Sequence, residues 1–163
     1  MGSGSIILKS AEELEIMGEA NQLVAATLTM LSTRIRPGVS TALLDGWAEE
    51  FVRERGGVPA FKGYRGFPGS LCVSLNEQVV HGIPSKKVVV REGDIVSIDF
   101  GVNWRGFYGD AAVTLPVGKV PDQTAELLRV TRESLRQGIG QVQVGNRIND
   151  IARAVQEHVE RHG

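Results

Sequence analysis

The sequence predicts an α+β fold in which a helix pair packs on an antiparallel sheet. Helical patterns occupy the beginning and the end of the chain. Between them, apolar and polar residues alternate on both sides of the stretch from Asn103 to Gly106, which is typical of a β-hairpin. A weak internal repeat adds a third observation, because a shift of 107 residues superimposes Gly38 on Gly145 within matching helix-break-helix patterns. The repeat predicts a duplicated, pseudo-symmetric layout.

The N-terminal part is expected to form two helices. A capping box, Ser10-Ala11-Glu12-Glu13, predicts a helix that runs to about Thr33 and breaks at Pro37. Ser40 is the expected N-cap of a second helix, which should end at Gly56. The apolar stripe expected to bury the first helix consists of Leu14, Met17, Leu23, Leu28 and Leu31.

Strands and a second helix pair are expected after residue 57. The composition of 58–69 shifts to glycine, proline and aromatic residues, which predicts a loop. Short strands are expected at 71–75 and 78–80, and the hairpin strands at 94–102 and 107–115. Helical patterns return after Pro121, over 124–137 and 146–162.

Two aspartates on the hairpin are the strongest chemical signal. With Trp104 and Arg105 as a two-residue loop, Asp99 would lie directly opposite Asp110. Facing carboxylates are destabilising, by roughly 3 kcal/mol at an effective dielectric constant near 20. A shared proton or a bound cation would relieve this repulsion, and a divalent metal site is the interpretation that we favour. The alternative is two solvated surface aspartates on a misregistered hairpin.

Composition limits the classes of function. The chain has 163 residues, 23% charged residues and a net charge of −1, so it offers no electrostatic basis for binding nucleic acid or an anionic membrane. No apolar run reaches transmembrane length and no signal-peptide pattern opens the chain, whose residues 1–5 look like a tag or linker. The single cysteine, Cys72, excludes an internal disulfide. We therefore expect a cytoplasmic protein.

Several short segments, taken in order and spacing, resemble the type I methionine aminopeptidases, which are metalloproteases of the pita-bread fold. The resemblance covers almost all of the chain after the leader. The matching segments are Lys62-Gly63-Tyr64-Arg65-Gly66-Phe67-Pro68, Ser74-Leu75-Asn76-Glu77, Val80-His81-Gly82-Ile83-Pro84, Gly93-Asp94-Ile95-Val96, Ile98-Asp99-Phe100-Gly101 and Gly109-Asp110.

The resemblance implies a role for each matching site residue. Asp99 matches an aspartate that chelates one ion of a dinuclear site, and Asp110 matches the aspartate that bridges both ions. Bridging carboxylates with one His and no thiolate suit Mn²⁺, Fe²⁺, Co²⁺ or Zn²⁺. His81 matches a histidine that contacts the substrate, an N-terminal Met peptide. The pocket for the methionine side chain is matched by Phe61, Tyr64, Phe67 and Cys72.

The resemblance also implies a division of the chain. Residues 6–120 would form the first pita-bread half, and 121–163 the helix pair of the second half, which ends before its strands. The family's remaining ligands, one His and two Glu, would lie on those strands. We therefore expect an N-terminal fragment that binds metal weakly and has no aminopeptidase activity alone.

Three interpretations stay open from the sequence. The first is a truncated or split methionine aminopeptidase that needs a complementary second half. The second is an engineered or stand-alone half-fold that self-associates, as a homodimer, or binds a partner without catalysis. The third is a catalytically silent relative used for binding, which the retention of both aspartates and His81 argues against.

Overall fold

The computed structural model describes residues 7–163, so the expected leader at 1–5 lies outside the described residues. The described chain forms two compact units, which divide between Lys119 and Val120. The first unit contains α1 (Ala11–Ser32), α2 (Thr41–Arg53), β1 (Val58–Pro59), a 3₁₀ turn (Tyr64–Gly66), β2 (Leu71–Leu75), β3 (Ile95–Trp104) and β4 (Phe107–Pro116). The second contains α3 (Asp122–Gly140) and α4 (Ile148–Glu160).

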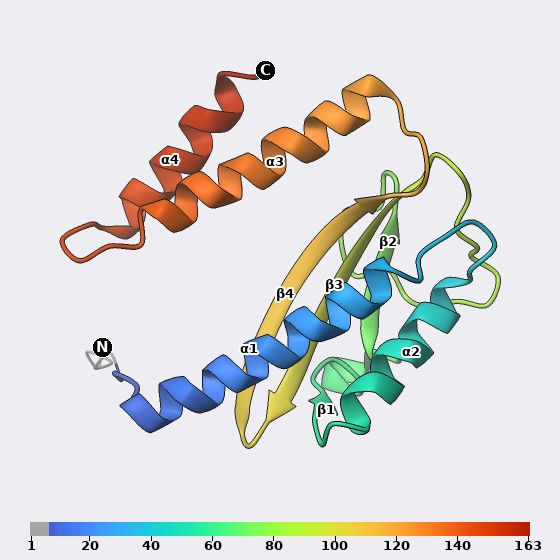
Figure 1. Ribbon diagram of the computed structural model, residues 1–163, viewed down its shortest axis with the longest axis horizontal. Coiled ribbons are helices and arrows are strands. Elements are labelled where there is room, and N and C mark those ends of the chain that lie inside the picture. Colours follow the sequence, from blue (N-terminus) through green and yellow to red (C-terminus); the bar gives the residue numbers. More distant parts are fainter. Residues whose placement is uncertain (1–6) are drawn as a thin grey trace. The chain divides into compact units, whose positions relative to one another are not determined.

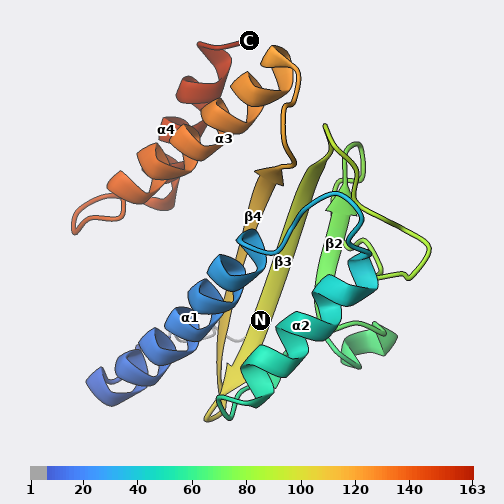
Figure 2. The same cartoon turned by 45° about the vertical axis from the view of Figure 1, so that its right-hand side comes forward.

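The sheet of the first unit is antiparallel and centred on β3. One side of β3 pairs with β4 along its whole length, and the other side pairs with β2 and then with the short β1. Both helices lie over the same face of this sheet (Figures 1 and 2), with α1 against β3 and β4 and α2 against β2 and β1. The expected α+β architecture of this unit is confirmed.

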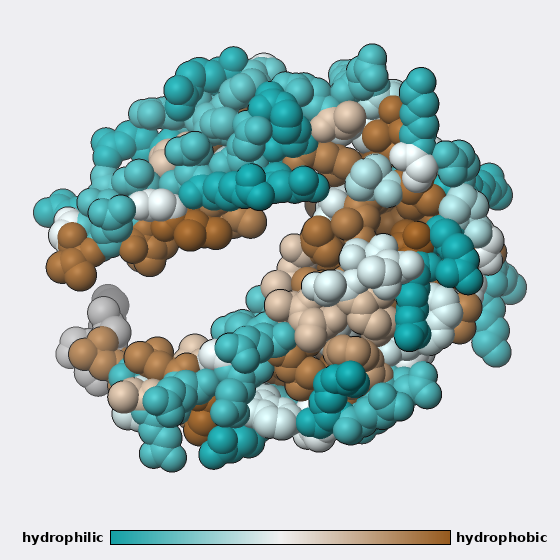
Figure 3. All heavy atoms as spheres, viewed as in Figure 1, coloured by the Kyte–Doolittle hydropathy of each residue, from teal (hydrophilic) through white to brown (hydrophobic). Residues whose placement is uncertain are grey.

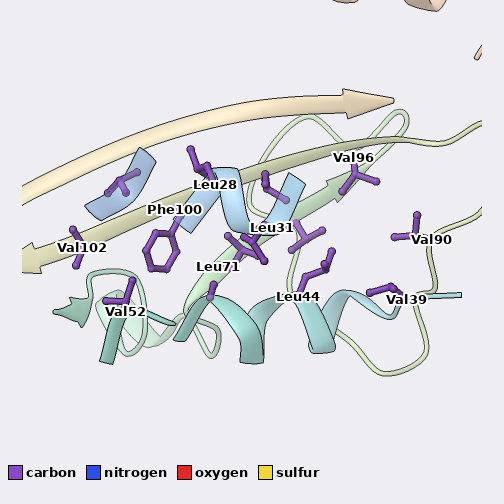
Figure 4. Packing of buried hydrophobic residues seen from close by; sticks show 14 of the residues in the cluster. Leu28, Leu31, Val39, Leu44, Val52, Leu71, Val90, Val96, Phe100 and Val102 are labelled. Atoms are coloured by element: carbon purple, nitrogen blue, oxygen red, sulfur yellow. The ribbon is translucent and has the colours of Figure 1, made fainter. Parts of the chain in front are cut away.

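The core lies between the two helices and the sheet (Figure 4). Alternate residues of β3 point into it, and Phe100 is its largest fully buried side chain. Leu31 and Leu44 meet the sheet from α1 and α2, and both are fully buried. The capping box at Ser10 is confirmed, since its hydroxyl accepts the Glu13 N–H at 3.1 Å. One residue of the expected α1 stripe, Leu14, is instead 56% exposed.

The register expected for the hairpin was wrong by one loop position. The two-residue loop is Arg105-Gly106, so Asp99 faces Ala112 and Asp110 faces Gly101. The turn needs positive φ at both central residues, and Arg105 (51°) and Gly106 (87°) provide it. Trp104 is instead the last residue of β3, and its indole Nε1 donates to Glu19 on α1 at 2.7 Å.

The strand expected at 78–80 was also wrong. Asn76 has a φ of 52° and begins a turn in which the Gln78 N–H donates to the Leu75 carbonyl at 3.0 Å. Val79 is 85% exposed and Val80 61% exposed, so this segment buries no apolar face, and it pairs with no strand among residues 7–163.

The second unit is an antiparallel helix hairpin. Gly138 of α3 approaches Val155 of α4 so closely that an added Cβ would lie 2.9 Å from the valine side chain. One side of this unit is strongly apolar, as the brown atoms of Figure 3 show. Its exposed large apolar residues include Leu127, Leu135, Ile139, Val142, Val144 and Ile148. No helix among residues 7–163 has both the length and the hydrophobicity needed to cross a bilayer.

Candidate functional site

The site lies on the face of the sheet that α1 and α2 leave uncovered. Successive residues of a strand point to opposite faces, and the even-numbered residues of β3 fill the core. Asp99 therefore points away from the helices, together with its cross-strand neighbours Cys72 and Ala112. Asp110 lies two residues from Ala112 and shares this face, as a diagonal neighbour of Asp99. The corrected register thus keeps both aspartates together.

A cavity of about 630 Å³ opens on this face. It contains all seven residues that the sequence singled out: Phe61, Tyr64, Phe67, Cys72, His81, Asp99 and Asp110. The loop between β1 and β2 supplies the three aromatic side chains, and the segment after β2 supplies His81. Four further residues line it: Arg65, Gly66, Pro68 and Ile83.

The four additional lining residues lie inside sequence motifs, although none of their side chains alone suggests a place in a binding site. Arg65, Gly66 and Pro68 fall inside the motif from Lys62 to Pro68, and Ile83 inside the motif that contains His81. A backbone that curls around a cavity exposes consecutive residues to it. Whole motifs are therefore better predictors of the lining than selected aromatic residues.

Burial and the negative charge of Asp110 act on Asp99, one of the two carboxyl groups in the cavity. Burial, followed by the charge of Asp110 and a hydrogen bond with its carboxyl group, raises the pKa of Asp99 to about 6. The pair therefore holds a proton more tightly than two solvated aspartates would. A divalent cation would relieve the same repulsion, so the donor set fits such an ion. Carboxylate oxygens are ligands for Mn²⁺ and for the other divalent metals expected above.

The two carboxylates supply only part of a metal's ligand shell. Within residues 7–163, no group of three or more His, Cys, Asp or Glu side chains has the geometry to hold a metal ion. His81 lines the same cavity. The described residues therefore present an acidic pair to a cation without enclosing it.

Gly82 attaches the segment that carries His81 to β2. His81 has a φ of 59°, a left-handed conformation that is uncommon for a residue with a side chain. The Gly82 carbonyl accepts the Val73 N–H at 3.0 Å, and the Gly82 N–H donates to the Ser74 hydroxyl at 3.1 Å. A Cβ on residue 82 would lie 2.0 Å from the Val73 oxygen, so only glycine fits there. This close contact with β2 fixes the backbone that presents His81.

Cys72 is expected to be an inert thiol. Its side chain is buried, and burial, followed by the charges of Asp99 and Asp110, raises its pKa to about 11. At about pH 8 the thiolate fraction should therefore be roughly 100-fold lower than in the unfolded chain. We expect the aromatic disulfide reagent DTNB to modify native Cys72 at least about 100-fold more slowly than the chain in guanidinium chloride. Comparable rates, measured by absorbance of the released thiolate, would contradict this environment.

Comparison with known proteins shows the family to which the chain belongs. A family model described as metallopeptidase family M24 matches residues 15–163. A methionine aminopeptidase of Clostridium acetobutylicum is 47% identical over 158 residues, covering 97% of this chain and 63% of that protein. Methionine aminopeptidase 1 of Bacillus subtilis is 48% identical over 155 residues and is covered to 62%. The chain thus spans somewhat less than two thirds of the length of these relatives.

Solved structures agree with this result. Methionine aminopeptidase from Thermotoga maritima superimposes with a TM-score of 0.94 at 42% identity, covering 98% of this chain and 64% of that one. The enzyme from Rickettsia prowazekii gives 0.93 at 35% identity, with 97% and 63% covered. The expected resemblance and the pita-bread fold, represented here in part, are confirmed. The chain belongs to metallopeptidase family M24, and its relatives in that family include methionine aminopeptidases.

Proposed function

We propose that this chain is the N-terminal fragment of a methionine aminopeptidase, an enzyme that removes N-terminal Met from nascent peptides. One observation supports this above all. Two adjacent carboxylates, a histidine and three aromatic side chains line a single cavity of about 630 Å³. An acidic pair beside an apolar pocket suits a substrate that has a thioether side chain and a free amino terminus.

Each residue has a separate task in this proposal. Asp99 and Asp110 would hold divalent cations, which, when bound, polarise the scissile carbonyl and lower the pKa of a water molecule. Phe61, Tyr64, Phe67 and Cys72 would receive the methionine side chain and exclude water from it. His81, fixed by Gly82, would donate to or accept from the peptide group next to the bond that is cleaved.

We further propose that the chain alone has no aminopeptidase activity and binds metal weakly. Two carboxylates leave most coordination positions of a Mn²⁺, Fe²⁺, Co²⁺ or Zn²⁺ ion to water. A complementary second half would have to supply the remaining ligands. The single cysteine supports a location in the reducing cytoplasm.

The test separates metal binding from turnover. Mn²⁺ added to ¹⁵N-labelled chain should broaden the amide signals around Asp99, Asp110 and His81 first, and the double variant D99N/D110N should lose this effect. Broadening confined to the acidic residues of α3 would overturn the proposed site. Release of methionine from a Met-Ala peptide with Mn²⁺ or Co²⁺ should stay at background, and robust turnover would overturn the proposed inactivity.

A second candidate function is a half-fold that associates with itself. The apolar side of the α3–α4 unit supports it, since Val144 is fully exposed and Ile148 is 83% exposed. The outer edge of β4 supports it as well, because within the described residues this ten-residue strand pairs with β3 alone. Sedimentation at micromolar concentration tests it. A homodimer is expected, and a strictly monomeric species would exclude this function.

A further inference from the structure

We propose that a polar row on α2, formed by Thr41, Asp45 and Glu49, positions the two backbone segments that wall the cavity. The three residues follow at intervals of four along the helix, so they lie on one side of it. The walls are the segment 61–70, which carries the aromatic residues, and the segment 81–85, which carries His81. None of the three residues lines the cavity itself.

Thr41 holds the segment that follows His81. Its hydroxyl accepts the Ser85 N–H at 2.8 Å and donates to the Ser85 carbonyl at 3.1 Å. Thr41 is 1% exposed, so both bonds form away from water. Ser85 is therefore fixed to the first turn of α2 through both of its backbone polar groups.

Asp45 holds the other wall at the start of β2. A single carboxylate oxygen accepts the Ser70 N–H at 2.7 Å and the Leu71 N–H at 2.8 Å. The same oxygen lies 3.1 Å from the position that a Cβ on Gly69 would occupy, and Pro84 lies 2.9 Å from that position. Asp45 therefore stands where the two walls touch. Charge-assisted bonds of this kind are stronger than neutral ones.

Glu49 completes the row at the beginning of the aromatic segment. Its carboxylate accepts from the Lys62 ammonium at 2.6 Å and from the Ser70 hydroxyl at 3.0 Å. The hydrogen bond from Lys62, followed by those from Arg53 and Ser70, lowers the pKa of Glu49 to about 2. Lys62 is the neighbour of Phe61, and Ser70 lies two residues before Cys72, so both ends of the aromatic wall are fixed to α2.

The row links α2, on one face of the sheet, to a cavity on the other face. The bonds of Thr41 and Asp45 reach backbone groups, and those of Glu49 reach the side chains of Lys62 and Ser70, which do not line the cavity. The row therefore sets where the walls lie and leaves the lining side chains free to contact a ligand. These three residues are therefore positioning residues. Their importance for recognising an N-terminal methionine rests on the proposed function, whereas their effect on the walls does not.

Cys72 provides a direct measure of the walls, since it is the chain's only cysteine and lies in the cavity. Alkylation by iodoacetamide would be followed by mass spectrometry for the wild type, Asp45→Ala and Asp45→Asn. In Asp45→Ala, Cys72 should be alkylated about tenfold faster than global unfolding of this variant alone would allow, because the wall opens locally. Asp45→Asn keeps an oxygen acceptor and should stay within about threefold of the wild type.

Val24→Ala is the matched control, because this core residue of α1 is 1% exposed and makes none of these bonds. It should destabilise the fold and raise the Cys72 rate only in proportion to global unfolding. The proposal would be overturned if the Cys72 alkylation rate of Asp45→Ala followed the same dependence on the free energy of unfolding as that of Val24→Ala.

A second set of measurements repeats the alkylation in the presence of a Met-Ala peptide. Failure of the peptide to protect wild-type Cys72 would count against the methionine pocket, and the ligand-free rates would still test the row.

Thr41→Val tests the other end of the row and preserves the shape of the side chain. Faster amide exchange is expected at Ser85 and its neighbours, with the exchange at Ser70 and Leu71 unchanged. Unchanged exchange at Ser85 in Thr41→Val would overturn the proposed role of the row at this wall, whether or not Asp45→Ala folds.

Discussion

Asp99→Asn is expected to stabilise the metal-free chain at about pH 7.5 by about 2 kcal/mol while abolishing the metal binding proposed for this pair. Burial and the charge of Asp110 raise the pKa of Asp99 to about 6, so the ionised form is held at a cost in the folded state. An asparagine keeps the shape of the side chain and removes the charge. Its amide can also donate to the Asp110 carboxylate.

The pH dependence has a definite sign. Since the folded-state pKa of Asp99 lies above its ordinary value of 3.8, the proton stabilises the fold below that value, and the stabilisation is lost as pH rises through about 6. The wild type should therefore become more stable relative to Asp99→Asn as the pH falls from about 7 to about 4. The difference between the two proteins should be largest above about pH 7 and shrink toward pH 4.

Urea unfolding in EDTA across this pH range measures the effect. The variants Asp99→Asn, Asp110→Asn and D99N/D110N form a double-mutant cycle. If the two carboxylates repel each other, the second substitution should add much less to the free energy of unfolding than the first. Strict additivity, or a loss of stability in Asp99→Asn, would mean that the two side chains do not repel each other in the folded chain.

The aspartate pair shows which part of a site a sequence can predict. The alternation of β3 and β4 assigns Asp99 and Asp110 to one face whichever two residues form the loop, because moving the loop by one position shifts the pairing by two residues. Their direct opposition depended on the turn, which the left-handed conformations of Arg105 and Gly106 decide. Local pattern therefore predicted the face and missed the register.

Long-range contacts explain the features that the sequence left undetected. The row Thr41, Asp45 and Glu49 looks like the solvated side of an amphipathic helix, yet Thr41 is buried and all three residues bind distant backbone or side chains. A polar residue at helical spacing gives no sign of its partner 25 residues away, as Ser70 is from Asp45. The valines at 79 and 80 led to the opposite error, a strand predicted where none forms. Both are exposed, and β-propensity without a partner strand does not make a strand.

Gly82→Ala, in contrast, should destabilise the chain, with a loss of about 2–4 kcal/mol in the free energy of unfolding. The new methyl group would lie 2.0 Å from the Val73 oxygen, which is backbone of β2 and cannot rotate away. The segment must therefore move. Residue 82 then loses the hydrogen bond from the Val73 N–H to its carbonyl and the one from its own N–H to the Ser74 hydroxyl. His81 would lose the contacts that keep its backbone at a φ of 59°.

Gly46→Ala is the matched control, since Gly46 lies within α2 and an added Cβ would meet nothing within 4 Å. Alanine is the better helix former, so this variant should gain about 0.5–1 kcal/mol by urea unfolding. The His81 ring signals should shift in Gly82→Ala and stay in place in Gly46→Ala. If Gly82→Ala were as stable as the wild type with unshifted His81 signals, the contact between Gly82 and β2 would not be what presents His81 to the cavity.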